Sequence, residues 1–242
     1  MEHRFVKISY TGRIKDGQVF DTTDADTAKK ENIFDAKRIY QAVPMIIGEM
    51  QVLKGLDEAL AGMKAGEEKE LDISAENAYG QKDPNLVRLV PMKIFKEQKM
   101  TPIPGMVIEL DGRPARIQTV SGGRVRVDFN SELAGKTLTY KVKIEEEAKN
   151  QAEKIKYLIE RSFNTSEGFE EKIAGKNIEI HVPEKSYKDR NVFVRKASLS
   201  AEIYKYSDIE NVTYVESWKK KKKEDKKGGE NEKPGEEEDL EE

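Results

Sequence analysis

The chain has 242 residues, of which 36% are apolar and 37% charged; 43 Lys and Arg against 46 Asp and Glu give a net charge of −3. This near balance disfavours a protein built mainly to coat nucleic acid, which would carry excess positive charge. The chain has no cysteine, which excludes disulfides, thiolate metal sites and cysteine nucleophiles within it. His3 and His181 lie too far apart in sequence to indicate a local metal motif, so we expect no metal and no cofactor.

No part of the sequence resembles a targeting or membrane-spanning segment. The first twenty residues lack the apolar core of a signal peptide, and no run approaches the roughly 18 apolar residues that a membrane-spanning helix needs. We therefore expect a soluble, cytoplasmic protein with no membrane partner.

The N-terminal third predicts strands packed on one helix. Val6, Ile8 and Tyr10 alternate with polar residues, and Asp16-Gly17 marks the tip of a hairpin. The polar stretch 24–43 indicates a long connecting segment, called the excursion below, with one helical turn. A short strand over 45–48 follows, and the apolar spacing predicts a helix over 52–63 and then a strand over 69–73.

From residue 84 to 130 the pattern changes to short strands separated by proline and glycine turns. These strands are expected over 86–90, 106–110, 115–120 and 124–129, which is typical of a small all-β module. A further alternating strand over 137–144 resumes the earlier pattern. The sequence thus indicates that the β module is inserted between two pieces of the first domain.

The C-terminal part predicts a separate α+β domain. Helices are expected over 151–163, 166–173 and 192–206, and strands over 177–182 and 212–215. After Trp218 a run of 24 residues holds 8 Lys and 10 Asp or Glu, a composition typical of disorder. The expected division is 1–84 with 131–150 as the first domain, 85–130 as the insert, 151–217 as the C-terminal domain, and 218–242 as a disordered Lys/Glu-rich tail.

Four segments in a fixed order carry the strongest functional signal. They are Ser9-Tyr10-Thr11-Gly12, Asp16-Gly17-x-x-Phe20-Asp21-Thr22, the stretch from Val52 to Leu60, and Ala78-Tyr79-Gly80. Together they resemble the FKBP-type peptidyl-prolyl cis/trans isomerases over about residues 4–84 and 131–148. The β module after Tyr79 is similar to the insert-in-flap domain of the long FKBPs of archaea and bacteria. The resemblance implies an antiparallel sheet wrapped on a helix, with an inserted all-β domain and a C-terminal α+β domain.

The resemblance also implies which residues act. Tyr79 would donate its hydroxyl to a substrate carbonyl, and Asp21, held by Tyr10, would be the polar group near the twisting amide. The apolar pocket positions are Phe20, Val52, Leu53, Leu56 and Tyr140. Rotation about an X–Pro bond faces a barrier of about 18–20 kcal/mol and needs no nucleophile or proton transfer. An apolar pocket suits this reaction because it disfavours the planar, charge-separated ground state relative to the twisted transition state.

A plainer interpretation stays open for each residue singly. Tyr10, Phe20 and Tyr140 would also serve as ordinary core residues on strands that face a helix, and Asp21 as a turn residue. Leu56 stands where the best-known family members have tryptophan, which makes the pocket floor smaller and leaves affinity for macrolides open. The excursion is also longer than in small members. The last wall of the pocket is therefore assigned only to the set Phe34, Tyr40, Val43 and Met45.

Three functions compete. The first is an isomerase acting on unfolded or partly folded, proline-containing chains that the insert and the C-terminal domain hold, which is chaperone activity; the holding surface would come from Leu86, Val90, Met92, Ile94, Phe95, Met100 and Met106. The second is a binding module without catalysis. The third is a nucleic-acid-binding insert, disfavoured because acidic residues interleave with Arg113, Arg116, Arg124 and Arg126.

The apolar C-terminal residues leave one further choice open. Ile155, Leu158, Ile159 and the segment 192–206 would form either a core of their own or a homodimer interface. We favour the homodimer, because a charged domain of about 65 residues has little core.

Overall fold

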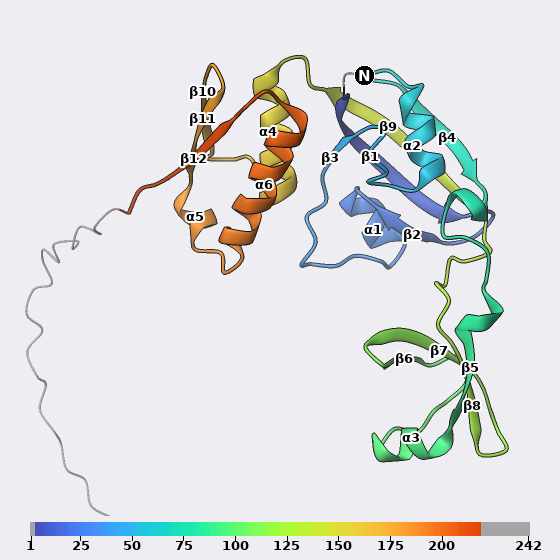
Figure 1. Cartoon of the computed structure of the whole chain (residues 1–242). Helices are drawn as coiled ribbons and strands as arrows, with labels where there is room; N and C mark the ends of the chain where they lie inside the picture. Colours follow the sequence, from blue (N-terminus) through green and yellow to red (C-terminus); the bar gives the residue numbers. More distant parts are fainter. Residues whose placement is uncertain (1–2, 219–242) are drawn as a thin grey trace, which may run out of the picture.

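The computed structural model describes residues 3–218, so the sequence prediction of a disordered tail over 218–242 lies almost wholly outside the described residues. Three sheets and three hydrophobic clusters organise the chain (Figure 1). No helix of the described part is long and apolar enough to cross a membrane.

The first sheet has five antiparallel strands in the order β2-β1-β9-β4, with β3 pairing to a different stretch of β1. Its elements are β1 (Phe5–Ile14), β2 (Val19–Thr22), α1 (Ala25–Lys30), β3 (Val43–Ile46), α2 (Lys54–Ala61), β4 (Glu68–Ile73), η1 (Ala75–Asn77) and β9 (Leu138–Glu147). Helix α2 lies across the sheet (Figure 1) and buries Leu56 and Leu60 against Val6 and Ile8 of β1. This confirms the predicted hairpin and the alternation along its first strand.

The insert is a four-stranded antiparallel sheet with its own core, placed between β4 and β9 in the chain and projecting away from the first sheet (Figure 1). Its elements are η2 (Pro84–Leu86), β5 (Val87–Pro91), α3 (Met92–Glu97), β6 (Val107–Leu110), β7 (Arg113–Ser121) and β8 (Arg124–Asp128). Helix α3 was not predicted. It follows Pro91 and is fixed by Phe95, whose side chain is fully buried in the insert core.

The C-terminal part packs two helices on a three-stranded sheet. Its elements are α4 (Gln151–Phe163), β10 (Glu170–Ala174), β11 (Asn177–Val182), α5 (Glu184–Tyr187), α6 (Val192–Tyr206) and β12 (Asn211–Glu216). The helix predicted over 166–173 is wrong. Gly168 has a positive φ of 80°, and the residues after it pair antiparallel with β11, so that Ile173 lies opposite Ile178.

Helix α4 also covers the face of the first sheet that is turned away from α2. Phe5 of β1 and Ile46 of β3 are buried in the same cluster as Ile155, Leu158 and Ile159 of α4. The homodimer hypothesis included these three α4 residues in the interface, and that part of it is wrong because they are buried within the chain. On α6, in contrast, Phe193 and Val194 are exposed.

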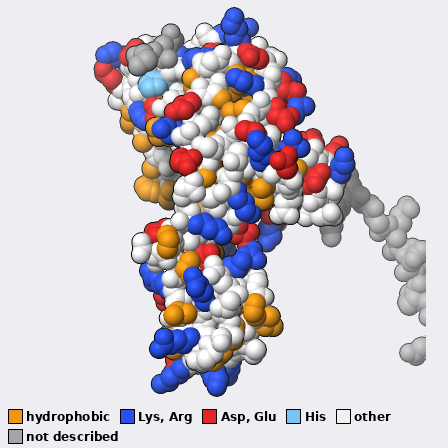
Figure 2. Space-filling view, turned by 90° about the vertical axis from the view of Figure 1, so that its right-hand side faces the viewer, with side chains coloured by type: hydrophobic (Ala, Val, Ile, Leu, Met, Phe, Trp, Pro, Cys, Tyr) orange, Lys and Arg blue, Asp and Glu red, His pale blue; other side chains and the backbone are white. Residues whose placement is uncertain are grey.

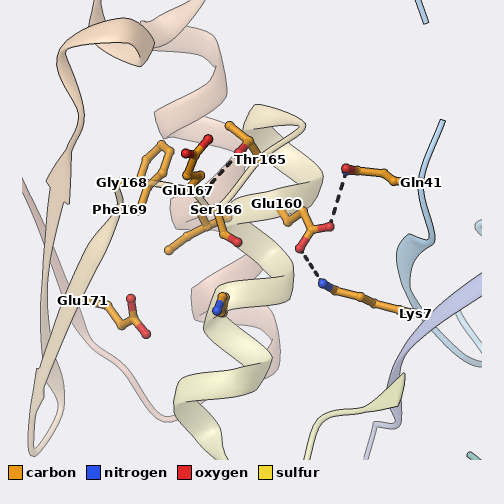
Figure 3. A pocket seen from close by; sticks show the side chains of 11 residues that line it. Lys7, Gln41, Glu160, Thr165, Ser166, Glu167, Gly168, Phe169 and Glu171 are labelled. Atoms are coloured by element: carbon orange, nitrogen blue, oxygen red, sulfur yellow. Dashed lines mark hydrogen bonds and ion pairs between the residues drawn. The ribbon is translucent and has the colours of Figure 1, made fainter. Parts of the chain in front are cut away.

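Charged residues add to this contact between the first sheet and the C-terminal part. Figure 3 shows Glu160 pointing from α4 toward Lys7 and Gln41, at the edge of a cavity of about 650 Å³. The Lys7 ammonium lies 2.8 Å from the Glu160 carboxylate, which is almost fully buried. Arg161, the next residue of α4, donates to the Gln51 side-chain oxygen at 2.5 Å. The C-terminal helices are therefore fixed to the first sheet by both apolar and ionic contacts.

Candidate active site

The candidate site residues come together at one end of the first sheet. Tyr10 on β1, Phe20 on β2 and Tyr140 on β9 belong to three adjacent strands, and the Tyr140 ring lies 5.9 Å from each of the other two rings. All three pack against the cluster that contains Leu56 of α2. Segments that the sequence places 130 residues apart thus form one aromatic cluster, and we call the groove that Phe20 of this cluster lines together with Tyr79 the aromatic cleft.

Gly12 makes this aromatic packing possible. It lies opposite both Asp21 and Tyr140 in the strand register. A Cβ atom at this position would come within 2.9 Å of the Phe20 ring and 3.0 Å of the Tyr140 ring. The glycine of the first motif is therefore required by the close approach of two rings above it.

The Asp21 carboxylate is held at both oxygens. The Tyr10 hydroxyl donates to Oδ2 at 2.8 Å, and the Arg38 guanidinium donates to Oδ1 at 2.5 Å. Burial, together with the adjacent Asp21 charge, raises the pKa of Tyr10 to about 12. Tyr10 therefore remains a neutral donor to Asp21 throughout the ordinary pH range.

Arg38 is the residue that sequence reasoning missed. It lies in the excursion between α1 and β3, 17 residues after its partner, and no local motif surrounds it. The only available signal was that a charged carboxylate at the edge of an apolar cleft needs a cationic partner.

Tyr79 follows η1 and stands at the outer edge of the cleft. Its side chain is about half exposed, and burial followed by the Asp21 charge raises the pKa of its hydroxyl. Within residues 3–218 the hydroxyl has no hydrogen-bond partner, so it is available to a ligand. Its position is set by Gly80, whose amide donates to the Ala75 carbonyl at 2.7 Å.

The first turn of α2 and the segment that leads into it pack beside the aromatic cluster. Leu56 is buried, while Val52 and Leu53 are partly buried and pack on the same cluster. The close approach of this turn requires Gly55, because a Cβ there would lie 2.7 Å from Ile73. Six of the eight side chains named from the sequence thus lie in or against this hydrophobic cluster. Asp21 is joined to it by the hydrogen bond from Tyr10, and Tyr79 lines a groove together with Phe20.

Helix α2 also supplies the cap that shapes the preceding turn. Asp57 is buried, and its carboxylate accepts hydrogen bonds from the amides of Gly48 at 2.9 Å and Met50 at 3.2 Å.

Among the residues left open for the last wall of the pocket, Met45 is fully buried in the core. Phe34 and Val43 are exposed, and Tyr40 stacks on Phe34.

The aromatic cleft is a groove of about 520 Å³ that extends to the insert. Phe20 and Tyr79 line it on one side, and Val107, Pro114 and Arg116 of the insert line it on the other. Within the part of the chain that the structure describes, no group of three acidic or histidine side chains is placed to hold a metal ion.

This cleft has the composition of a site that binds an apolar, uncharged ring and offers it two polar contacts, and it stands on an antiparallel sheet wrapped on one helix. The family model described as "FKBP26, IF domain" matches residues 88–133, and the model described as "FKBP26_C-terminal" matches residues 151–219.

Curated relatives extend the likeness to the first sheet. The chain is 37% identical over 140 residues to the short-type peptidyl-prolyl cis-trans isomerase of Methanocaldococcus jannaschii, covering 58% of this chain and 88% of that protein. It is 36% identical to a probable FKBP-type 16 kDa peptidyl-prolyl cis-trans isomerase of Pseudomonas fluorescens, covering 40% of this chain and 67% of that protein. It is also 32% identical to the FKBP-type isomerase SlyD of Aeromonas hydrophila, over 62% of this chain and 65% of that one.

The chain therefore belongs to the FKBP-type peptidyl-prolyl cis-trans isomerases, with an insert in the flap, and it is an enzyme of that class.

Proposed function

We propose that the aromatic cleft catalyses rotation about X–Pro bonds in folding polypeptides, and that the insert and the C-terminal part hold those chains while the cleft acts on them. The main support for catalysis is the Asp21 carboxylate, which Tyr10 and Arg38 fix beside the rings of Phe20 and Tyr140.

In this proposal the proline ring enters between the aromatic side chains and rests on Leu56. Removing the X–Pro amide from water disfavours its planar, charge-separated form, and twisting it reduces that charge separation. The free Tyr79 hydroxyl donates to a carbonyl of the substrate beside the proline, and fixed Asp21 supplies a local field that differs between planar and twisted amide. No bond is made or broken, which agrees with a site built from rings, one hydroxyl and one oriented carboxylate.

The holding surface of the insert differs from the set expected from the sequence. Phe95 and Val90 are buried in the insert core, and Leu86, Met92 and Met100 are partly buried against it. Ile94 and Met106 are exposed, and the structure adds three further exposed apolar side chains, those of Leu89, Ile103 and Val107. Figure 2 shows hydrophobic side chains scattered among Lys and Arg on the insert, which forms the lower part of the view.

One feature supports cooperation between insert and cleft. The groove places Val107 of the insert on the same cavity as Phe20 and Tyr79. A chain held loosely on the insert would therefore present its prolines to the cleft repeatedly, at a raised local concentration.

The test of catalysis is isomerisation of a short proline peptide by the wild type and by Asp21→Ala and Tyr79→Phe. Tyr204→Phe and Asp208→Ala are matched controls, because both residues are exposed in the C-terminal part. We expect kcat/KM to fall about tenfold or more in the two site variants, as for loss of a polar contact of about 1–3 kcal/mol, and to stay unchanged in the controls. An inactive wild type that still binds unfolded protein would instead favour a binding module without catalysis.

Contacts that arginine side chains of the insert make within the chain also disfavour nucleic-acid binding. Arg113 lies over the Phe129 ring at 5.5 Å, and Arg116 forms an ion pair with Glu132 and donates to the Gly105 carbonyl at 2.9 Å. These two guanidinium groups are thus engaged within the chain.

A further inference from the structure

A continuous row of cationic and aromatic side chains begins at the end of α1, runs through the excursion between α1 and β3, and ends at Asp21. The segment leaves the end of α1 and returns to β3 beside the first sheet (Figure 1). Lys29 lies over the Phe34 ring at 5.4 Å, and Phe34 stacks on Tyr40 with the ring centroids 5.2 Å apart and the planes 13° apart. The Arg38 guanidinium lies 5.4 Å from the centre of the Tyr40 ring.

The turn that connects these residues is closed by hydrogen bonds of its own. The Tyr40 hydroxyl accepts from the Asp35 amide at 2.9 Å, and the Asp35 carboxylate accepts from the Lys37 amide at 2.8 Å. The Arg38 amide donates to the Asp35 carbonyl at 3.1 Å. The Tyr40 ring is therefore fixed to the same turn whose end carries the Arg38 side chain.

Arg38 needs such support. Its side chain is 39% exposed, and that of Asp21 is 30% exposed. An ion pair of this exposure contributes little by itself, because ordering a long arginine side chain costs conformational entropy. A guanidinium held over an aromatic face has already lost part of that freedom, and the cation–π contact adds a favourable interaction of about 0.5–1 kcal/mol at an exposed site.

We propose that the stacked pair Phe34–Tyr40 is a positioning device for the isomerase site: it orients Arg38, which with Tyr10 fixes the plane of the Asp21 carboxylate. Neither ring has to touch the substrate. The inference rests on the proposed role of Asp21, and it explains why two aromatic rings are kept at the surface of a polar excursion, with Phe34 44% exposed.

The test is a double-mutant cycle on peptide isomerisation with Tyr40→Leu, Arg38→Ala and the double variant. We expect Tyr40→Leu to lower kcat about three- to tenfold, the range of coupling through one positioned side chain, while peptide affinity measured by NMR titration stays unchanged. In the Arg38→Ala background, Tyr40→Leu should have no further effect, because the residue through which it acts is gone.

Conservative variants separate positioning from general damage. Tyr40→Phe keeps the ring but loses the hydrogen bond from the Asp35 amide, so Tyr40→Phe and Phe34→Leu should both lie between Tyr40→Leu and the wild type. Lys37→Ala, in the same turn and exposed, is the matched control. The melting temperature of each variant shows whether the fold is kept.

Three results would overturn the inference while the proposed role of Asp21 stands. Additive effects of Tyr40→Leu and Arg38→Ala would mean that the ring does not act through Arg38. A loss of peptide affinity with kcat intact would make Tyr40 a substrate contact. If Tyr40→Leu keeps the wild-type kcat while Asp21→Ala is impaired, the rings have no positioning role, although the proposed role of Asp21 stands. If Asp21→Ala is itself unimpaired, the proposed role of Asp21 fails, and this inference fails with it.

Discussion

Gly12 of β1 lies directly opposite Tyr140 of β9, and the aromatic ring occupies the space that any side chain at Gly12 would need. The same space is shared with the Phe20 ring on the other neighbouring strand. The Phe20 and Tyr140 rings can occupy these positions only because residue 12 has no side chain.

Gly12→Ala is expected to displace both rings. Overpacking of this kind costs about 1–3 kcal/mol of stability, and the displaced rings should lower kcat/KM for a proline peptide about tenfold. The measurements are peptide isomerisation and urea unfolding. Gly62→Ala is the control, because a Cβ at Gly62 meets no atom closer than 3.7 Å. Full activity of Gly12→Ala would mean that the rings do not define the site.

Deleting residues 85–129 should separate the two proposed activities. Asp83 and Asn130 are joined by two hydrogen bonds, one from the Asp83 amide to the Asn130 side chain and one from the Asn130 side chain to the Asp83 carbonyl. The first sheet can therefore close with a short linker. We expect isomerisation of a short peptide to stay within about twofold, and catalysed refolding of a proline-limited protein to slow about tenfold or more, because the raised local substrate concentration is lost. Equal losses in the two assays would contradict this division.

The ion pair between Lys7 and Glu160 should behave as a buried pair between the first sheet and α4. Removing one partner, in Glu160→Gln, leaves the Lys7 charge in a site partly shielded from water and should cost about 2–3 kcal/mol of unfolding free energy, below the roughly 3–5 kcal/mol of a fully buried pair because Lys7 is 19% exposed. The double variant Lys7→Met/Glu160→Leu should recover most of that loss. Chemical denaturation measures both, and additive losses would show that the two residues do not interact.

The raised pKa of Tyr10 predicts a loss of folding stability at alkaline pH. Its pKa of about 12 in the folded protein lies above the value of about 10 in an unfolded chain. The folded state thus binds the proton more tightly, so this contribution is complete below pH 10 and is lost as the pH rises from 10 to 12. Tyr214, whose pKa burial also raises to about 12, shares the window. Unfolding measured from pH 8 to 12 should show a shallower decline in Tyr10→Phe than in the wild type.

Substitution of the exposed residues Phe193 and Val194 on α6 tests the homodimer expected from the sequence. If a second copy covers this end of α6, Phe193→Ser with Val194→Ser should lower the mass found by light scattering from two chains to one. A wild type that scatters as a single chain at micromolar concentration would end the hypothesis.

The sequence by itself determined the sheet, the insert and most of the cleft. Alternation places Val6, Ile8 and Tyr10 on one face of β1, and the four motifs lie in an order that names the family. Those signals are local, because each depends on residues within a few positions of one another. Short strands between proline and glycine turns likewise marked the insert without any contact being known.

Only the tertiary structure decided the rest. Arg38 reaches Asp21 across an excursion with no motif, and Phe5 is buried because α4 covers a sheet face that the sequence could not assign. The segment before Asn177 has helical spacing at Phe169 and Ile173, but pairing with β11 makes it a strand. In each case the deciding partner lies in a distant segment, and spacing along the chain does not encode which distant surface will cover a given face.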